Sequence, residues 1–332
     1  MAVVREAIND QQAILMSTYV TSVEITTLQD KGMVFRTSTS GELPAQNLAK
    51  YSVSELGYKK ASIFYIDNAF GKGLSASFKK GFEQEGGSVL TEVTYSSLVD
   101  LEAYDITDKL NEVIERDPEV VFVVAERPDV KFLATKMDSV FPGKEIVVLG
   151  SEEVMQESIL ESKALDGMYG MLPKPLTNQG FISKYKQRTG HTPVVMATGD
   201  VYDIVYLMSL AILKVGEVNP IKISKTLSSH QEGECLSALK WNELKEKVSK
   251  KEEVCYQGIS GPILFDQNGK TYITGTYTGF GIAFGEPISA ANTKAYIKRL
   301  DDQGQEIWHQ DLENNAVLEY QSSEIEKYSR HQ

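Results

Sequence analysis

The sequence has little of what metal and nucleophilic chemistry need. Its 332 residues include 2 cysteines and 4 histidines, with no CxxC pair and no Cys/His cluster. The patterns GxSxG, GxxxxGK[ST], HExxH and GxGxxG are absent as well. Each of these places a nucleophile, a phosphate cradle or a zinc ligand at a fixed spacing. We therefore expect no enzyme, no metal site and no cofactor.

A basic surface and a long apolar run are also missing. The 34 Lys and Arg stand against 46 Asp and Glu, a net charge of −12. Nucleic acid and anionic membranes both require basic faces, so we expect neither as a partner. The longest apolar stretch, residues 204–213, is far shorter than the roughly 18 residues of a membrane span, which predicts no direct membrane insertion. Residues 1–6 lack the pattern of a signal peptide, so none is expected in this chain.

Short β-rich runs alternate with helix-like segments over the first half of the chain. The β-rich runs are 61–66, 88–95, 120–124, 146–149 and 167–172. The segments with helical spacing are 43–56, 73–85, 103–116 and 130–141. Residues 120–124 are apolar throughout, which is typical of a central parallel strand buried on both faces. This order predicts an α/β fold with a doubly wound parallel sheet.

In such a sheet, ligands bind beyond the carboxyl ends of the strands. Three loops follow predicted strands directly, and they begin at Asp67, Ala125 and Gly150. We expect a binding site among these loops.

Several separated motifs follow one another in a recognisable order. They are residues 17–21 with Ile25-Thr26, Phe35-Arg36-Thr37, Leu56-Gly57-Tyr58-Lys59-Lys60, residues 67–73, Gly150-Ser151-Glu152, Asp166-Gly167-Met168-Tyr169-Gly170, Tyr202-Asp203, and residues 261–269. Each is weak by itself. Together, from about residue 13 to 270, they resemble the type I periplasmic binding proteins of the Leu/Ile/Val-binding class, while the last fifty or so residues match poorly.

The resemblance implies a periplasmic binding protein-like I fold, with two doubly wound lobes around a hinged cleft. Lobe one would hold residues 1–37 and 174–260, lobe two residues 38–173 and 261–315, and a polar tail residues 316–332. Residues 35–40 would cross from one lobe to the other. Ligand binding would shift such a protein toward its closed form.

The front of the chain departs from the family pattern. The family's lobe one begins with three strand–helix units before the segment that matches residue 14, so roughly 90 residues of the pattern are missing. We expect an N-terminally truncated lobe one, from a shortened reading frame, an expressed fragment or one part of a split protein. On this expectation, residues 14–17 lack parallel neighbours and the helices at 198–228 lack a surface to cover.

Amino-acid binders of the family hold the ligand carboxylate on a short Ser/Thr-containing loop after a lobe-one strand. By resemblance this loop is Tyr19, Val20 and Thr21, preceded by Ser17 and Thr18. Backbone N–H and hydroxyl donors suit an anion. A capped turn that binds no ligand is the other interpretation of these residues.

The remaining ligand-binding positions would come from lobe two. Phe70 stands where the family commonly has Tyr, which keeps an apolar wall but removes a hydroxyl. Glu152 matches the acid that holds the ligand ammonium through charge-assisted bonds, with an exposed loop acid beside Glu153 as the alternative. Glu126, or its neighbour Arg127, would make the cleft wall charged and favours a more polar ligand than a branched aliphatic amino acid.

The resemblance thus predicts a non-enzymatic solute-binding receptor for a small polar ligand, an amino acid or similar zwitterion. It would serve an ABC transporter permease and be periplasmic or extracytoplasmic. The alternative is a ligand-free sensor or scaffold domain of the same fold that binds a protein partner; an α/β enzyme has no catalytic constellation to support it. Cys235 and Cys255 could pair in an oxidising compartment or remain free thiols. The sequence leaves that choice and the oligomeric state open.

Overall fold

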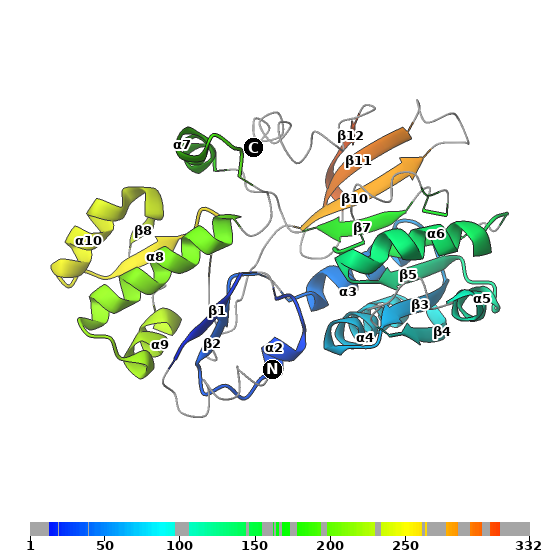
Figure 1. Ribbon diagram of the computed structural model, residues 1–332, viewed down its shortest axis with the longest axis horizontal. Helices are drawn as coiled ribbons and strands as arrows, with labels where there is room; N and C mark the ends of the chain where they lie inside the picture. The colour runs from blue at the N-terminus through cyan, green and yellow to red at the C-terminus, as the bar shows by residue number, and fades with distance from the viewer. Residues whose placement is uncertain are drawn as a thin grey trace.

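The elements gather into two bodies, with β1 and β2 between them (Figure 1). The computed structural model describes residues 13–18, 20–38, 40–96, 106–143, 146–154, 162, 164–165, 168–172, 178–193, 198–229, 234–260, 263, 277–284, 293–300 and 306–312. The predicted site residue Tyr19 and the tail 316–332 lie outside this part of the chain.

An eight-stranded sheet forms the centre of one body. Its order is β12-β11-β10-β7-β6-β5-β3-β4. The strands are β3 (Lys60–Ile66), β4 (Ser88–Tyr95), β5 (Val120–Val124), β6 (Val147–Gly150), β7 (Tyr169–Leu172), β10 (Tyr277–Phe284), β11 (Thr293–Leu300) and β12 (Glu306–Leu312). The pairs from β4 to β7 are parallel, and those from β7 to β12 are antiparallel. The predicted parallel sheet is confirmed.

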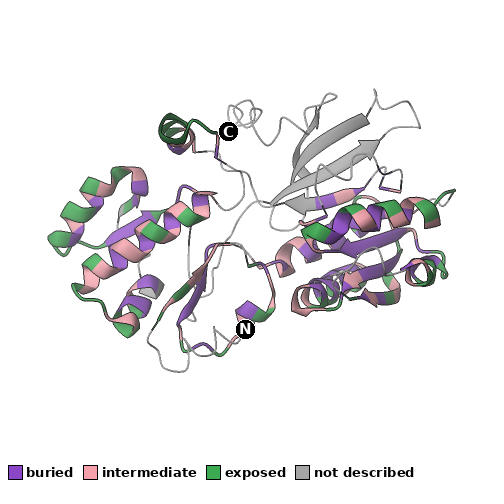
Figure 2. Ribbon diagram, viewed as in Figure 1, coloured by how far each residue is buried: buried purple, intermediate pink, exposed green. Residues whose placement is uncertain are grey.

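Helices cover both faces of the parallel strands. They are α3 (Glu42–Ser54) and α4 (Ala69–Gln84) on one face, and α5 (Thr107–Ile114), the 3-10 turn η1 (Arg127–Asp129) and α6 (Val130–Val140) on the other. Side chains alternate along a strand, so Ile63 packs with α3 and α4, whereas Phe64 packs with α5 and α6. All five residues of β5 are buried. Figure 2 shows this buried interior between helices whose outer faces are exposed.

Helix α4 begins at Ala69, four residues before the predicted start at residue 73. Asn68 caps it, because its Oδ1 accepts from Gly71 N at 2.9 Å. Gly71 is required there, since a Cβ would lie 1.9 Å from Ile66 O. Phe70 therefore belongs to the first turn of a helix rather than to a loop.

The other body is mainly helical. Its elements are α7 (Gln179–Thr189), α8 (Thr198–Val215), α9 (Pro220–Ser229), β8 (Glu234–Ser237), the 3-10 turn η3 (Ala238–Lys240), α10 (Trp241–Ser249) and β9 (Val254–Gln257). Leu207, Leu227, Leu244 and Tyr256 belong to its core. β8 and β9 are parallel, and Cys235 and Cys255 stand opposite each other and form a disulfide. In the described residues, no helix is both long and apolar enough to cross a bilayer.

One expectation about the front of the chain is wrong, and a second holds only in part. β1 (Leu15–Ser17) has a parallel neighbour in β2 (Val34–Arg36), with Met16 opposite Phe35. The helices of residues 198–228 cover the fully buried Phe35, which packs into their core, but Val201, Val205 and Leu213 of α8 stay exposed. A 16-residue connection that includes α2 (Glu24–Thr27) lets β2 return beside β1. Sequence reasoning took residues 35–40 only as a crossover and so missed this pairing.

Asp203 joins α8 to the segment after β9. Its carboxylate is fully buried and accepts four hydrogen bonds, from Tyr256 Oη at 2.6 Å, Ile259 N at 2.9 Å, Ser260 N at 2.9 Å and Ser260 Oγ at 2.5 Å. Burial raises the pKa of Asp203, and these hydrogen bonds oppose the shift. A carboxylate has about four acceptor positions, so its hydrogen-bonding capacity is filled.

We predict that Asp203→Ala lowers the free energy of unfolding by about 3 kcal/mol or more, because buried donors lose their acceptor. Urea unfolding followed by Trp241 fluorescence, in a Trp308→Phe background, measures the change in this body. The control is Glu253→Ala, which removes a surface ion pair with Lys214, a residue of α8 like Asp203. It should change the free energy of unfolding by less than about 1 kcal/mol. Equal effects of the two substitutions would contradict the anchoring role of Asp203.

Candidate functional site

A hydrogen bond between distant parts of the chain marks the candidate site. Thr21 Oγ1 donates to Glu152 Oε1 at 2.5 Å, across 131 residues of sequence. Glu152 follows β6 at the carboxyl edge of the sheet, and Thr21 follows β1. Both are buried, at 6% and 8% exposure for Thr21 and Glu152. The structure therefore brings together two residues that the resemblance assigned to opposite lobes.

The loop that carries Thr21 is held on several sides. Gly41 N donates to Thr21 O at 2.8 Å, just before α3 begins. Ser38 Oγ donates to Val20 O at 3.3 Å, and Val20 N donates to Ser17 Oγ at 3.3 Å. Gly73 of α4 approaches so closely that a Cβ there would lie 3.1 Å from Val23. The loop is thus fixed against the sheet-containing body.

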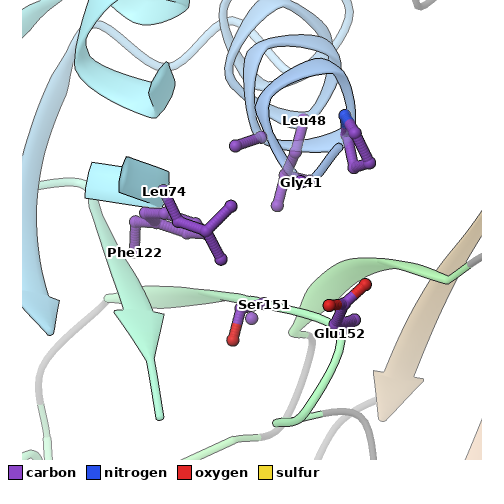
Figure 3. Close-up of a pocket in the computed structure, with 9 residues that line it drawn as sticks. Gly41, Leu48, Leu74, Phe122, Ser151 and Glu152 are labelled. Atoms are coloured by element: carbon purple, nitrogen blue, oxygen red, sulfur yellow. The ribbon is translucent and has the colours of Figure 1, made fainter. Parts of the chain in front are cut away.

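Beside Glu152 lies a small cavity of about 20 Å³ (Figure 3). Its lining consists of Gly41, Pro44, Ala45, Leu48, Leu74, Phe122, Gly150, Ser151 and Glu152. In Figure 3 Leu74 and Phe122 form one side, and the Glu152 carboxylate lies on the opposite side, below α3. The space holds about one water-sized group.

The electrostatics of this site follow from burial. Burial raises the pKa of Glu152 to about 7; the hydrogen bond from Thr21 opposes the shift and nearby Glu153 adds to it. No cation among the described residues forms an ion pair with Glu152. Near neutral pH this carboxyl group can therefore accept from a hydroxyl or attract an incoming cation.

The other predicted positions form a separate group at the same edge of the sheet. Phe70 is half-buried and packs against both cores. Asn68 Nδ2 donates to Glu126 Oε1 at 2.8 Å, which holds Glu126 beside the first turn of α4. Arg127 points to Glu153 instead, with Nε 3.0 Å from Oε2. Neither Phe70, Glu126 nor Val20 lines the cavity.

Sequence reasoning missed most of the cavity lining. Leu48, Leu74 and Phe122 were assigned to helix and strand interiors, and apolar periodicity cannot tell a core residue from one at a cavity. Arg36 was noted only as part of a motif. The described residues contain no group of three or more His, Cys, Asp or Glu that could hold a metal ion.

The sequence profile of one protein family, described as "Receptor family ligand binding region", matches residues 1–276. The chain belongs to this family. Its fold is that of the type I periplasmic binding proteins, as the motifs predicted. No curated protein matches the sequence.

Solved structures of this receptor fold resemble the chain at low sequence identity. A leucine-binding protein from Thermotoga maritima is 18% identical with a TM-score of 0.65, over 86% of this chain and 74% of that one. A solute-binding protein of an ABC transporter from R. palustris, in complex with benzoate, is 17% identical with a TM-score of 0.62, over 87% and 72%. A type 1 periplasmic binding protein from Bordetella pertussis is 13% identical with a TM-score of 0.67, over 90% and 77%. At these identities the likeness shows the fold alone.

The raised pKa of Glu152 predicts a pH-dependent stability. Its folded-state pKa of about 7 exceeds the ordinary 4.5, so its contribution is fully present below about pH 4.5 and is lost as pH rises through 7. The loss is on the order of 3 kcal/mol at most. Urea unfolding between pH 4.5 and 8 should show this component in the native protein and in Glu153→Gln, and lack it in Glu152→Gln. Parallel pH profiles for all three proteins would contradict the burial of an ionisable Glu152.

Proposed function

We propose that this protein is a non-enzymatic solute-binding receptor that closes on a small polar ligand, an amino acid or similar zwitterion, between Thr21 and Glu152. The Thr21–Glu152 contact is the observation that carries the proposal. It joins a hydroxyl donor and a carboxylate from distant parts of the chain at the edge of the sheet where α/β proteins bind ligands. A zwitterion would replace this contact, with its carboxylate at the Thr21 loop and its ammonium at Glu152.

The proposed division into lobes follows the sequence prediction. Lobe one comprises residues 1–37 and 174–260, and lobe two comprises residues 38–173 and 261–315. The separate cores around Leu207 and around Phe122 support it. So does Asp200 at the start of α8, which forms a hydrogen bond with Thr37 in the segment that crosses between the bodies. Rotation about such segments would open the Thr21–Glu152 contact and admit ligand.

The lining of the cavity bears on the ligand. Leu48, Leu74 and Phe122 are apolar, so part of the ligand near Glu152 would be apolar. Glu126 and Arg127, which we expected to make the cleft wall charged, already have partners in the protein. Asn68 donates a hydrogen bond to Glu126, and Arg127 pairs with Glu153. We therefore propose a ligand with a zwitterionic head and a short side chain whose first carbons contact the Leu48 side of the cavity.

A periplasmic or extracytoplasmic location, with delivery to an ABC transporter permease, belongs to the same proposal. The disulfide between Cys235 and Cys255 supports it, because such bonds persist mainly in oxidising compartments. Solved structures of the same fold include solute-binding proteins of ABC transporters in complex with leucine and with benzoate.

Thermal-shift screening of the full chain against the standard L-amino acids and benzoate tests the proposal. A ligand at about one hundred times its Kd adds close to 3 kcal/mol of stability, which raises Tm by a few degrees. Glu152→Ala should remove this response, whereas Glu153→Ala, at the neighbouring acid, should keep it. Absence of a shift with every compound would count against an amino-acid or benzoate receptor.

The alternative, a ligand-free sensor or scaffold domain, also has support. The cavity has room for only about one water. Val201 and Val205 on α8 and Val218 after it are 51%, 56% and 83% exposed, and exposed apolar groups of this kind can contact a protein partner. In that case no compound would shift Tm, and Glu152→Ala would leave binding to the protein partner unchanged, which separates the two functions.

A further inference from the structure

Arg36 is the largest side chain buried almost completely in the described part of the chain, at 1% exposure. It ends β2, one residue before the segment that leads toward α3. Burial of a guanidinium group is unfavourable unless its N–H groups are satisfied. Its hydrogen bonds therefore show where the structure depends on it.

Those bonds go to the loop that carries Thr21. Arg36 Nη1 donates to Ser22 O at 2.8 Å, and Nη2 donates to Thr26 Oγ1 at 2.6 Å. Ser22 is the next residue after Thr21, and Thr26 lies on α2. The Arg36 guanidinium thus forms hydrogen bonds with both ends of the segment 22–26, which follows Thr21.

The segment cannot hold this shape unaided. α2 has four residues, with no side-chain hydrogen bond at its N-terminus, and isolated helices this short are unstable in water. On its other side, Val23 packs against Gly73 and Thr21 O accepts from Gly41 N. Arg36 of β2 therefore holds the loop on one side, while α3 and α4 of the sheet-containing body hold it on the other.

We infer that Arg36 is a positioning residue for ligand binding: its guanidinium sets the backbone of residues 20–26 so that the Thr21 hydroxyl faces Glu152. This inference rests on the proposed function of the Thr21–Glu152 site. Arginine suits the role because its rigid fork reaches two acceptors at once. A lysine ammonium would satisfy one acceptor and leave the other without its donor.

Hydrogen–deuterium exchange of the ligand-free full chain tests the positioning directly. In Arg36→Lys, amides of residues 20–27 should exchange about tenfold faster, while those of α3 and β3 keep their rates. Thr26→Val removes only the acceptor of Nη2 and should accelerate the same amides about threefold, with less risk to folding. Arg116→Lys is the matched control, because Arg116 donates from Nη1 to a backbone oxygen, that of Leu90, in lobe two.

A double-mutant cycle in ligand affinity tests whether Arg36 acts through Thr21. With L-glutamine as the probe in isothermal titration, Arg36→Lys should weaken Kd about tenfold in the native background. In a Thr21→Val background the same change should have little further effect, since residues that act as a unit are not additive. A merely structural Arg36 would give additive losses.

The outcomes separate the two proposals. Unchanged exchange at residues 20–27 in both variants, or acceleration spread equally over α3 and α8, would overturn the role of Arg36. Failure of the native protein to bind L-glutamine, with local acceleration in Arg36→Lys, would count against this ligand while leaving the positioning of the Thr21 loop supported.

Discussion

The structure depends on a fully buried carboxylate whose acceptor positions are all filled. Asp203 can be ionised in the interior only where several donors converge, and here a tyrosine hydroxyl, a serine hydroxyl and two backbone amides do so. This requirement fixes the exit of β9 against the second turn of α8. One turn earlier, half-buried Asp200 bonds to Thr37, and its pKa is raised to about 6 by burial. Thr37 and the segment after β9 are therefore both held near the start of α8.

The candidate site uses the same chemistry with fewer donors. Glu152 is as well shielded as a core residue, yet among the described residues its hydrogen-bond donor is a single hydroxyl, that of Thr21 in the loop after β1. The Glu152 carboxyl group accepts one hydrogen bond where Asp203 accepts four, so fewer interactions are lost when its partner leaves. On the proposed function, a ligand cation would replace that hydroxyl when the bodies separate. The contrast separates an acid that anchors the fold from one that is available for the proposed binding role.

Much of the sheet-containing body was predictable from the sequence. Residues 120–124 had to be a buried strand because no exposed face could carry five consecutive apolar side chains, and α3 to α6 followed from their spacing. The start of α4 was missed because Asn68 acts as a cap through a side-chain bond that periodicity does not record. The pairing of β1 with β2 was missed because strands of three residues carry almost no pattern. Thr21 and Glu152 were proposed together only through family resemblance.

The sequence by itself determined the fold class, the alternation of strands and helices between residues 61 and 172, and the absence of known enzyme signatures, because these depend on local periodicity and composition. Only the tertiary structure decided which distant groups meet. It placed Thr21 in contact with Glu152 and paired Cys235 with Cys255. It also brought the Arg36 guanidinium within hydrogen-bond distance of Ser22 and Thr26. Such contacts depend on loop closure over many residues and on the direction of each side chain. Neither leaves a periodic trace in a single sequence.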